Sequence, residues 1–220
     1  EWLDQQAAAQ LVIYDEPSDS YALPSTSAAV LADPDSPFWL AGGLVGIHAL
    51  YLDLDKGIEV MKGDGALGWG DHHPYLFEGT QELFRPAYDH QLVQQWLPQR
   101  AQGVEDLETG IRVADIGCGT GYSTLTLARA FPNSTFIGFD FHQPSIEEAR
   151  RKASEAGLSN VSFEVSAADA IPGPFDLICF FDCLHDMGDP VGIASHAISQ
   201  LSQGGSIVLV EPFAKQTRTE

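Results

Sequence analysis

The densest chemical signal in the sequence is the segment from Val113 to Gly121, which reads Val-Ala-Asp-Ile-Gly-Cys-Gly-Thr-Gly. Glycines at alternate positions let a backbone turn sharply and approach a ligand closely. A helix that begins at the last glycine would also offer free N–H groups to an anionic or polar group. Asp115 adds a carboxylate that can accept a hydrogen bond from an ammonium group or from water. The segment therefore predicts a small-molecule site where a strand meets a helix.

Two other glycine-rich motifs do not fit this segment. A dinucleotide fold requires G-x-G-x-x-G, but the sixth position is Tyr122 when counted from Gly117 and Thr124 when counted from Gly119. The phosphate-binding Walker motif fails as well, because no Gly-Lys-Ser/Thr follows. A binding site for a pyrophosphate is thus not indicated.

Three histidines could accept a proton during a reaction. His185 lies just beyond the apolar run that ends at Phe181, and is the candidate general base. His72 and His73 precede Tyr75 and Phe77 and could face the same cavity, although a His-Pro turn can also bind its own backbone. His185 could likewise brace a loop or cap a helix. Two adjacent histidines without a nearby third ligand do not indicate a metal, so no metal site is assigned.

The elements that must position these residues alternate between strand and helix after residue 110. Strands are expected at 111–116, 135–140, 161–165, 175–181 and 206–211, and helices at 121–130, 144–156 and 190–201. Such alternation predicts right-handed crossovers and a parallel sheet, which is an α/β fold. Acidic residues follow the second, third and fourth strands at Asp140, Asp169 and Asp182.

The pattern D-x-G-x-G-x-G, together with these acids, resembles the class I methyltransferases, which implies a Rossmann-like parallel sheet and the cofactor S-adenosylmethionine (SAM), with S-adenosylhomocysteine as product. The resemblance implies that Asp140 holds the ribose hydroxyls and that Asp169 meets the adenine amino group. The implied cofactor-binding residues are Asp115, Gly117, Cys118, Gly119, Gly121, Asp140, Phe141, Ala168, Asp169, Ala170 and Phe181.

The same resemblance implies that the substrate approaches the loop after the fourth strand, where Asp182, His185 and Asp186 lie. Simpler roles remain open for some residues. Asp140 could cap the next helix, Asp169 could be an ordinary loop acid, and Cys118 fits a small filler better than a nucleophile.

The chain before residue 111 is similar to a narrower bacterial group, the winged-helix-linked methyltransferases. The resemblance rests on Tyr21-Ala22-Leu23-Pro24, Asp71-His72-His73-Pro74, Phe77-Glu78-Gly79-Thr80 and Leu184-His185-Asp186-Met187. It implies that residues 1–32 are the end of a winged helix (helix 2–10 and a hairpin of strands 11–14 and 21–23), and that 33–110 form a helical cap over the active site in 111–220. A helix is expected to begin near Phe38, because Leu40, Leu44, Ile47, His48 and Tyr51 fit one helical face.

The sequence departs from that pattern at both ends. The first part of a winged helix is absent, and too few residues follow Glu211 for the last two strands of a class I sheet. An open sheet edge is unfavourable in a free domain, so we expect further chain, or a partner, to cover it.

Charge and cysteine content narrow the choice of partners. The chain has 11 Lys and Arg against 31 Asp and Glu, a net charge of −20, which disfavours nucleic acid. The first ten residues contain no Lys or Arg, so this helix fits homodimerisation better than binding in a DNA groove. Cys118, Cys179 and Cys183 fit buried, reduced thiols and a cytoplasmic protein, and no apolar run is long enough for a membrane span.

The preferred hypothesis is a SAM-dependent methyltransferase that moves a methyl group to a small-molecule acceptor by in-line displacement. Two alternatives remain open: a SAM-binding transcriptional regulator that uses the winged helix, and a non-catalytic dimer scaffold. The first alternative needs a basic recognition surface, and the second would be favoured by loss of Asp115, Asp140 and Asp169, all of which are present.

Overall fold

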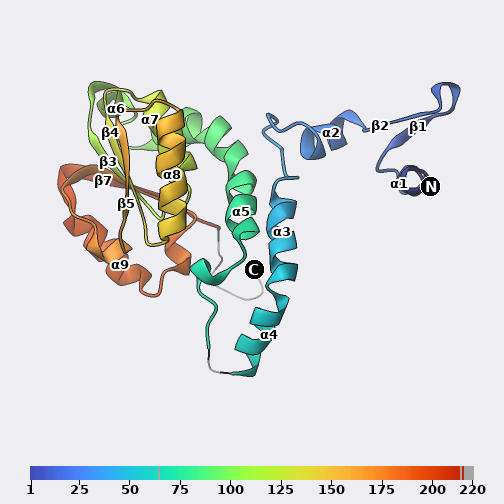
Figure 1. Cartoon of the computed structure of the whole chain (residues 1–220). Coiled ribbons are helices and arrows are strands. Elements are labelled where there is room, and N and C mark those ends of the chain that lie inside the picture. Colours follow the sequence, from blue (N-terminus) through green and yellow to red (C-terminus); the bar gives the residue numbers. More distant parts are fainter. Residues whose placement is uncertain (64, 214, 216–220) are drawn as a thin grey trace. The chain divides into compact units, whose positions relative to one another are not determined.

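A computed structural model describes residues 1–63, 65–213 and 215 of the chain (Figure 1). The chain divides into two compact units, Glu1–His90 and Gln91–Glu220. Within the described residues, no helix is long and apolar enough to cross a membrane.

The first unit opens with a helix and a hairpin. Helix α1 (Trp2–Ala8) is followed by β1 (Ile13–Asp15), the 3-10 turn η1 (Glu16–Ser18) and β2 (Ser20–Ala22). The two strands pair antiparallel, with Ile13 opposite Ala22. The expected helix, turn and returning strand are thus confirmed, with boundaries that move by one or two residues.

Helices make up the rest of the first unit. They are α2 (Ser25–Leu31), α3 (Gly43–Leu52), α4 (Leu54–Lys62) and α5 (Pro74–Ala87), with the 3-10 turn η2 (Trp69–Asp71) before α5. Helix α3 packs along α5 (Figure 1).

The helix expected to begin near Phe38 begins at Gly43. The residues expected on one helical face are exposed: Leu40, Leu44, Ile47, His48 and Tyr51. Its buried residues are Gly46 and Ala49. The reason is the close approach of α5, since a Cβ built on Gly79 would lie only 2.1 Å from the backbone nitrogen of Gly46.

The second unit is a parallel sheet with helices on both faces. The π-helical stretch η3 (Tyr88–Trp96) runs across the boundary between the units, and η4 (Leu97–Gln99) and α6 (Glu105–Thr109) follow it. The strands are β3 (Arg112–Ile116), β4 (Thr135–Asp140), β5 (Val161–Val165), β6 (Phe175–Phe181) and β7 (Leu201–Val210). The helices between them are α7 (Tyr122–Ala130), α8 (Gln143–Glu155) and α9 (Pro190–Ser199), with the 3-10 turns η5 (Ala168–Ala170) and η6 (Leu184–Asp186).

The strand order is β5-β4-β3-β6-β7, and every pair is parallel. The Rossmann-like α/β sheet expected from the sequence is therefore confirmed. Because β3 lies at the centre and the order reverses there, the carboxyl ends of β3, β4 and β6 meet at the switch point, where open α/β sheets bind ligands.

Two apolar clusters fill the space between the sheet and its helices. One contains Phe139, Phe175 and Phe180 with Ala197 of α9, and the other contains Phe163 with residues of α7 and α8. Strand β6 is buried along nearly all of its length, as expected for a strand covered on both faces.

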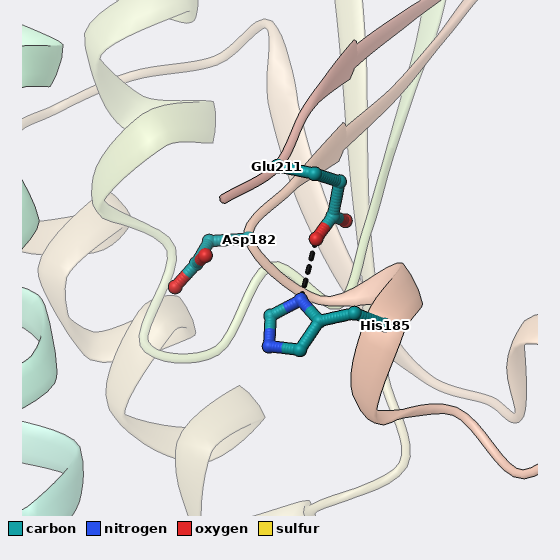
Figure 2. Close-up of side chains that lie close together, drawn as sticks. All are labelled: Asp182, His185 and Glu211. Carbon is teal, nitrogen blue, oxygen red and sulfur yellow. Dashed lines mark hydrogen bonds and ion pairs between the residues drawn. The ribbon is translucent and has the colours of Figure 1, made fainter. Parts of the chain in front are cut away.

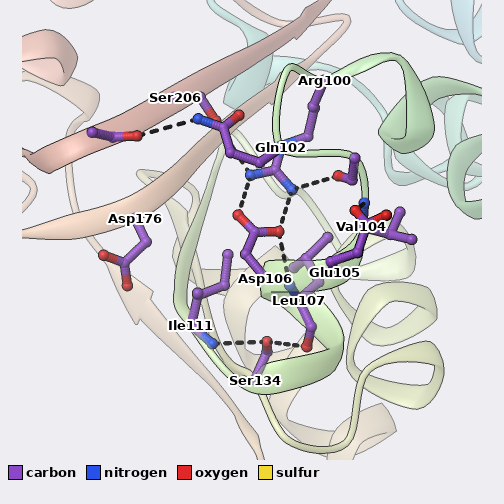
Figure 3. Close-up of polar contacts among 12 residues, drawn as sticks. Arg100, Gln102, Val104, Glu105, Asp106, Leu107, Ile111, Ser134, Asp176 and Ser206 are labelled. Atoms are coloured by element: carbon purple, nitrogen blue, oxygen red, sulfur yellow. Dashed lines mark hydrogen bonds and ion pairs between the residues drawn. The ribbon is translucent and has the colours of Figure 1, made fainter.

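Strand β7 starts five residues earlier than the sequence predicts, at Leu201 instead of residue 206. The polar residues 202–205 continue the strand, and its pairing with β6 is irregular between Phe175 and Leu177. A polar network holds this part of the chain (Figure 3). Arg100 is bonded to both carboxylate oxygens of Asp106, at 3.0 and 2.7 Å, and donates to Ser206 Oγ at 3.3 Å. Buried charge is thus paired where the segment before β3 meets β7.

Candidate active site

The segment from Gly117 to Gly121 forms a tight loop between β3 and α7. Its three glycines have φ values of 71°, 53° and 82°, which side chains disfavour. The N–H groups of Gly117 and Cys118 both donate to the carbonyl of Phe139, at 2.8 and 3.1 Å. The loop is therefore fastened to the carboxyl end of β4.

The three glycines of the loop serve different purposes. A Cβ on Gly121 would lie 2.7 Å from the Phe163 ring, and a Cβ on Gly138 of β4 would meet the same ring at 2.5 Å. A Cβ on Gly117 would meet Cys183 at 2.8 Å. At Gly119, by contrast, a Cβ would meet no described atom within 4 Å. Gly119 is therefore the glycine of the loop that faces open space.

Asp140 links the loop to the end of β4. Its Oδ2 accepts a hydrogen bond from the Gly119 N–H at 2.9 Å, and its Oδ1 accepts from the His142 N–H at 2.8 Å. The carboxylate stands beside the open space at Gly119. It does not cap α8, whose N-cap residue is His142, without a side-chain cap hydrogen bond, so the bond to the His142 N–H orders only the approach to that helix.

Asp115 is buried at the end of β3. Its Oδ2 accepts from Ser123 Oγ at 2.6 Å and from Thr124 Oγ1 at 2.7 Å, both in the first turn of α7. Its Oδ1 is buried and has no hydrogen-bond partner among the described residues. Burial raises the pKa of Asp115 to about 6, although the two hydroxyl hydrogen bonds oppose the shift. One buried acceptor thus remains available to a donor.

The other residues expected at the cofactor site fall at the same edge of the sheet. Phe141 follows β4 and is exposed, Asp169 lies exposed in η5 after β5, and Phe181 is buried at the end of β6. Ala168 and Ala170 flank Asp169 in the same 3-10 turn. The Cys118 side chain is buried, and burial raises the pKa of its thiol, which fits the filler role.

His185 and Glu211 form a hydrogen-bonded pair at the ends of β6 and β7 (Figure 2). The His185 Nδ1–H donates to Glu211 Oε2 at 2.5 Å. Glu211 Oε1 accepts from the backbone N–H groups of Leu184 and Cys183, at 2.8 and 3.2 Å. The carboxylate therefore fixes both the loop that carries His185 and the orientation of its ring, which leaves Nε2 as the nitrogen that can accept a proton.

Electrostatics favour the charged form of both partners. The hydrogen bond to Glu211 raises the pKa of His185 above its ordinary value, since burial opposes the shift only in part. Burial alone would raise the pKa of Glu211, but the hydrogen bonds from His185, Leu184 and Cys183 outweigh it and hold the pKa below its ordinary range. Asp186 lies 3.4 Å from His185 Nε2.

Sequence reasoning did not single out Glu211, although a signal was present. It follows β7 directly, and the carboxyl ends of adjacent parallel strands lie at one edge of a sheet. The nearby Asp182, which begins the loop that carries His185, has φ 55° and a pKa that burial raises above the ordinary value.

The histidines at 72 and 73 belong to the first unit, where they hold the start of α5. Asp53 is buried and accepts from the His73 backbone N–H at 2.7 Å, from His72 Nδ1 at 3.0 Å and from Lys56 Nζ at 2.9 Å. His73 Nδ1 accepts from the Tyr75 N–H at 3.2 Å, as the His-Pro alternative expected. The Phe77 ring packs edge-on against Trp69, at 5.3 Å between centroids.

The chain is similar in sequence to several methyltransferases. The chain is 33% identical over 132 residues to the aklanonic acid methyltransferase DauC of Streptomyces sp. (strain C5), covering 57% of this chain and 60% of that protein. It is 29% identical over 148 residues to the 27-O-demethylrifamycin SV methyltransferase of Amycolatopsis mediterranei, covering 64% of this chain and 51% of that protein. The chain spans about half of the length of the curated relatives it matches.

Among solved structures, an O-methyltransferase family protein from Burkholderia thailandensis is similar with a TM-score of 0.69 and 17% identity. The similarity covers 94% of this chain and 63% of that one, and it supports the fold alone. The family model described as "Methyltransferase domain" matches residues 107–219. Because that match takes in more than half of the chain, the protein belongs to the methyltransferase domain family.

Proposed function

We propose that the protein is a SAM-dependent methyltransferase that methylates a small-molecule acceptor, with His185 as general base. The observation that carries the proposal is the hydrogen bond from the Gly119 N–H to Asp140 Oδ2, because it joins the open face of the glycine loop to a carboxylate at the switch point. The family match and the relatives that act on small molecules support the same reaction class.

The residues present fit SAM. Gly119 leaves room for a ligand, Asp140 offers a carboxylate of the kind that holds ribose hydroxyls, and Asp115 Oδ1 is an unused buried acceptor. Asp169 and Phe141 extend the same edge and would meet the adenosine end. When bound, SAM would supply an electrophilic methyl group on a sulfonium, a good leaving group.

The protein's own residues would align the acceptor and remove its proton. In-line alignment is the larger part of the task, since correct placement alone removes a large share of the barrier of a bimolecular displacement. His185 Nε2 would take the proton of an acceptor hydroxyl or amine, while Glu211 holds the ring and stabilises the imidazolium that forms. Glu211 is thus a positioning residue, and Asp182 and Asp186 border the acceptor side.

Calorimetric titration with SAM and S-adenosylhomocysteine tests the cofactor site. The parent should bind both, and Asp140→Ala should weaken binding about tenfold or more because it loses the carboxylate beside Gly119. Glu164→Gln is the matched control, since it removes one exposed carboxylate from β5. Equal affinity in Asp140→Ala and the parent would contradict the proposal. Methyl transfer from labelled SAM to a panel of phenols, hydroxyacids and amines then tests the reaction.

We also propose that residues 1–32 are the end of a winged helix and that they contribute to a homodimer. Support comes from apolar side chains that the first unit leaves exposed, among them Trp2, Leu11 and Ile13. Sedimentation equilibrium should give a dimer for the parent and a weaker one for Trp2→Ser with Ile13→Ser. A parent monomer at micromolar concentration would contradict this part.

For the helical part, residues 33–110, we propose a cap that contributes acceptor contacts, and for the whole protein a cytoplasmic location. Within the cap, His72 and His73 are already bonded to Asp53 and the start of α5, so Tyr75, which is half exposed, is the better acceptor contact. Tyr75→Ala should raise the KM for the acceptor and leave SAM affinity unchanged. The opposite pattern would argue against the cap.

A further inference from the structure

We infer that Asp182, His185 and Glu211 form a binding site for a divalent transition-metal ion, and that metal binding and proton acceptance by His185 exclude each other. The inhibitory part rests on the proposed function, whereas the binding part does not. Neither the family match nor the relatives assign a metal to these residues.

The geometry brings three ligand atoms of suitable type together. One nitrogen or oxygen atom from each residue lies within 4.8 Å of the other two. Asp182 directly follows β6, His185 lies in η6, and Glu211 directly follows β7, so adjacent strand ends place all three (Figure 2). The site is therefore built on the sheet and does not depend on a single loop.

Little movement separates this arrangement from a coordination sphere. Metal–ligand bonds of about 2.0–2.2 Å place ligand atoms roughly 3–3.5 Å apart. His185 Nδ1 and Glu211 Oε2 are 2.5 Å apart across their hydrogen bond, so they would lose the proton between them and separate by about 0.5–1 Å. Only the Asp182 carboxylate has to approach, and among the described residues no donor is hydrogen-bonded to it, so its side chain can rotate.

The donor set selects the kind of ion. One imidazole nitrogen and two carboxylate oxygens suit Zn²⁺, Co²⁺ and similar ions, whereas Mg²⁺ and Ca²⁺ prefer oxygen ligands alone. Two carboxylates also balance the charge of a divalent cation. Three protein ligands leave a coordination position for water.

Metal binding would remove His185 as a base. The ion would take the place of the proton on Nδ1: a neutral ring moves that proton to Nε2, and an imidazolium releases one proton to solvent. The remaining ring proton then sits on Nε2, which can no longer accept one.

Titration of the metal-free full chain with Co²⁺, followed by visible absorption and calorimetry, tests the binding. We expect one Co²⁺ ion to bind tightly to each chain. Zn²⁺ should displace this ion, and excess Mg²⁺ should not. Asp182→Asn and His185→Gln should each weaken Co²⁺ binding about tenfold or more, and circular dichroism should show that both variants are folded. Glu164→Gln, which removes a carboxylate elsewhere on the sheet, should bind like the parent.

Absence of this tightly bound ion would overturn the inference, and so would equal Co²⁺ affinity in the parent, Asp182→Asn and His185→Gln, since that pattern means binding to the acidic surface at large. The two proposals fail separately. Co²⁺ binding without any methyl transfer would leave the site standing and refute the function, while turnover that Zn²⁺ does not inhibit would refute the exclusion and leave the function standing.

Discussion

Gly79 of α5 rests directly on Gly46 of α3, so closely that a Cβ at position 79 would lie 2.1 Å from the Gly46 nitrogen. Backbone-to-backbone contact of this kind allows two helices to pack without large side chains between them. It explains why the buried side of α3 consists of Gly46 and Ala49 while its leucines are exposed.

Gly79→Ala should therefore destabilise the first unit by about 1–3 kcal/mol, because the helices must move apart. Gly57→Ala is the matched control. Gly57 lies inside α4, where a Cβ would meet no described atom within 4 Å, so alanine should raise stability by up to about 1 kcal/mol through helix propensity. Chemical denaturation of both variants measures the difference, and equal stabilities would refute the packing role.

The pair of His185 and Glu211 predicts how methyl transfer depends on pH. Activity should rise with pH as His185 loses its proton, because only the neutral ring is a base. Glu211 raises the pKa of His185, so Glu211→Gln should move this rising limb of the rate–pH profile to lower pH. It should also reduce kcat about 10²-fold, because the ring loses its orientation. Rate–pH profiles of the two proteins give both effects.

His185→Gln is the companion variant, and it should lose the limb altogether. An unchanged limb in Glu211→Gln would mean that another group titrates. A purely structural role for Glu211 would lower the yield of folded protein and leave the limb where it is, so the profile separates the two explanations.

Gly119 predicts a loss of binding without a loss of fold. Alanine at φ 53° costs about 1–2 kcal/mol of conformational strain, but meets no described atom within 4 Å. Gly157→Ala, at φ 64° and in equally open space after α8, should cost the same. Only Gly119→Ala should weaken SAM binding in calorimetry, and equal affinities in the two variants would show that Gly119 does not face the cofactor.

Asp115 predicts a specific dependence of stability on pH. Its pKa is about 6 in the folded protein against 3.8 ordinarily, so the folded state holds the proton more tightly. The free energy of unfolding should therefore fall as pH rises from 3.8 to about 6, by on the order of 3 kcal/mol from this group. Asp115→Asn should remove that part of the slope, which denaturation at several pH values detects.

Ser123→Ala provides the opposite change. It removes a hydrogen bond that lowers the pKa of Asp115, so the slope should steepen and extend to higher pH. Identical slopes in the parent and Asp115→Asn would mean that the carboxyl titrates alike in both states.

The sequence predicted the sheet well because its signals are local. Strand β6 is apolar except for Asp176, and β3 to β5 are apolar segments bounded by turn-forming residues, so their bounds agree within a residue. The early start of β7 was not visible, because residues 202–205 are serine, glutamine and two glycines, and their partners include Gln102, which donates to the Gly204 carbonyl and is distant in the chain.

The site was predicted where a motif marks it and missed where only three-dimensional proximity does. The glycine loop and Asp140 were identified from spacing, whereas Glu211 has no local motif and meets His185 only through the alignment of β6 and β7. The α3 interface was misplaced for a related reason, since hydrophobic periodicity weights large side chains and cannot recognise a contact made by Gly46 and Gly79.

The ring of Phe163 occupies the space that both Gly121 and Gly138 leave free. Evolutionary exchange at these three positions should consequently be correlated: a larger residue at 121 or 138 becomes tolerable only when 163 becomes smaller. Part of the glycine signature would then be inherited together with an aromatic on β5, as one unit of packing. Ancestral or recombined chains that mix these positions should lose the fold before they lose any ligand contact.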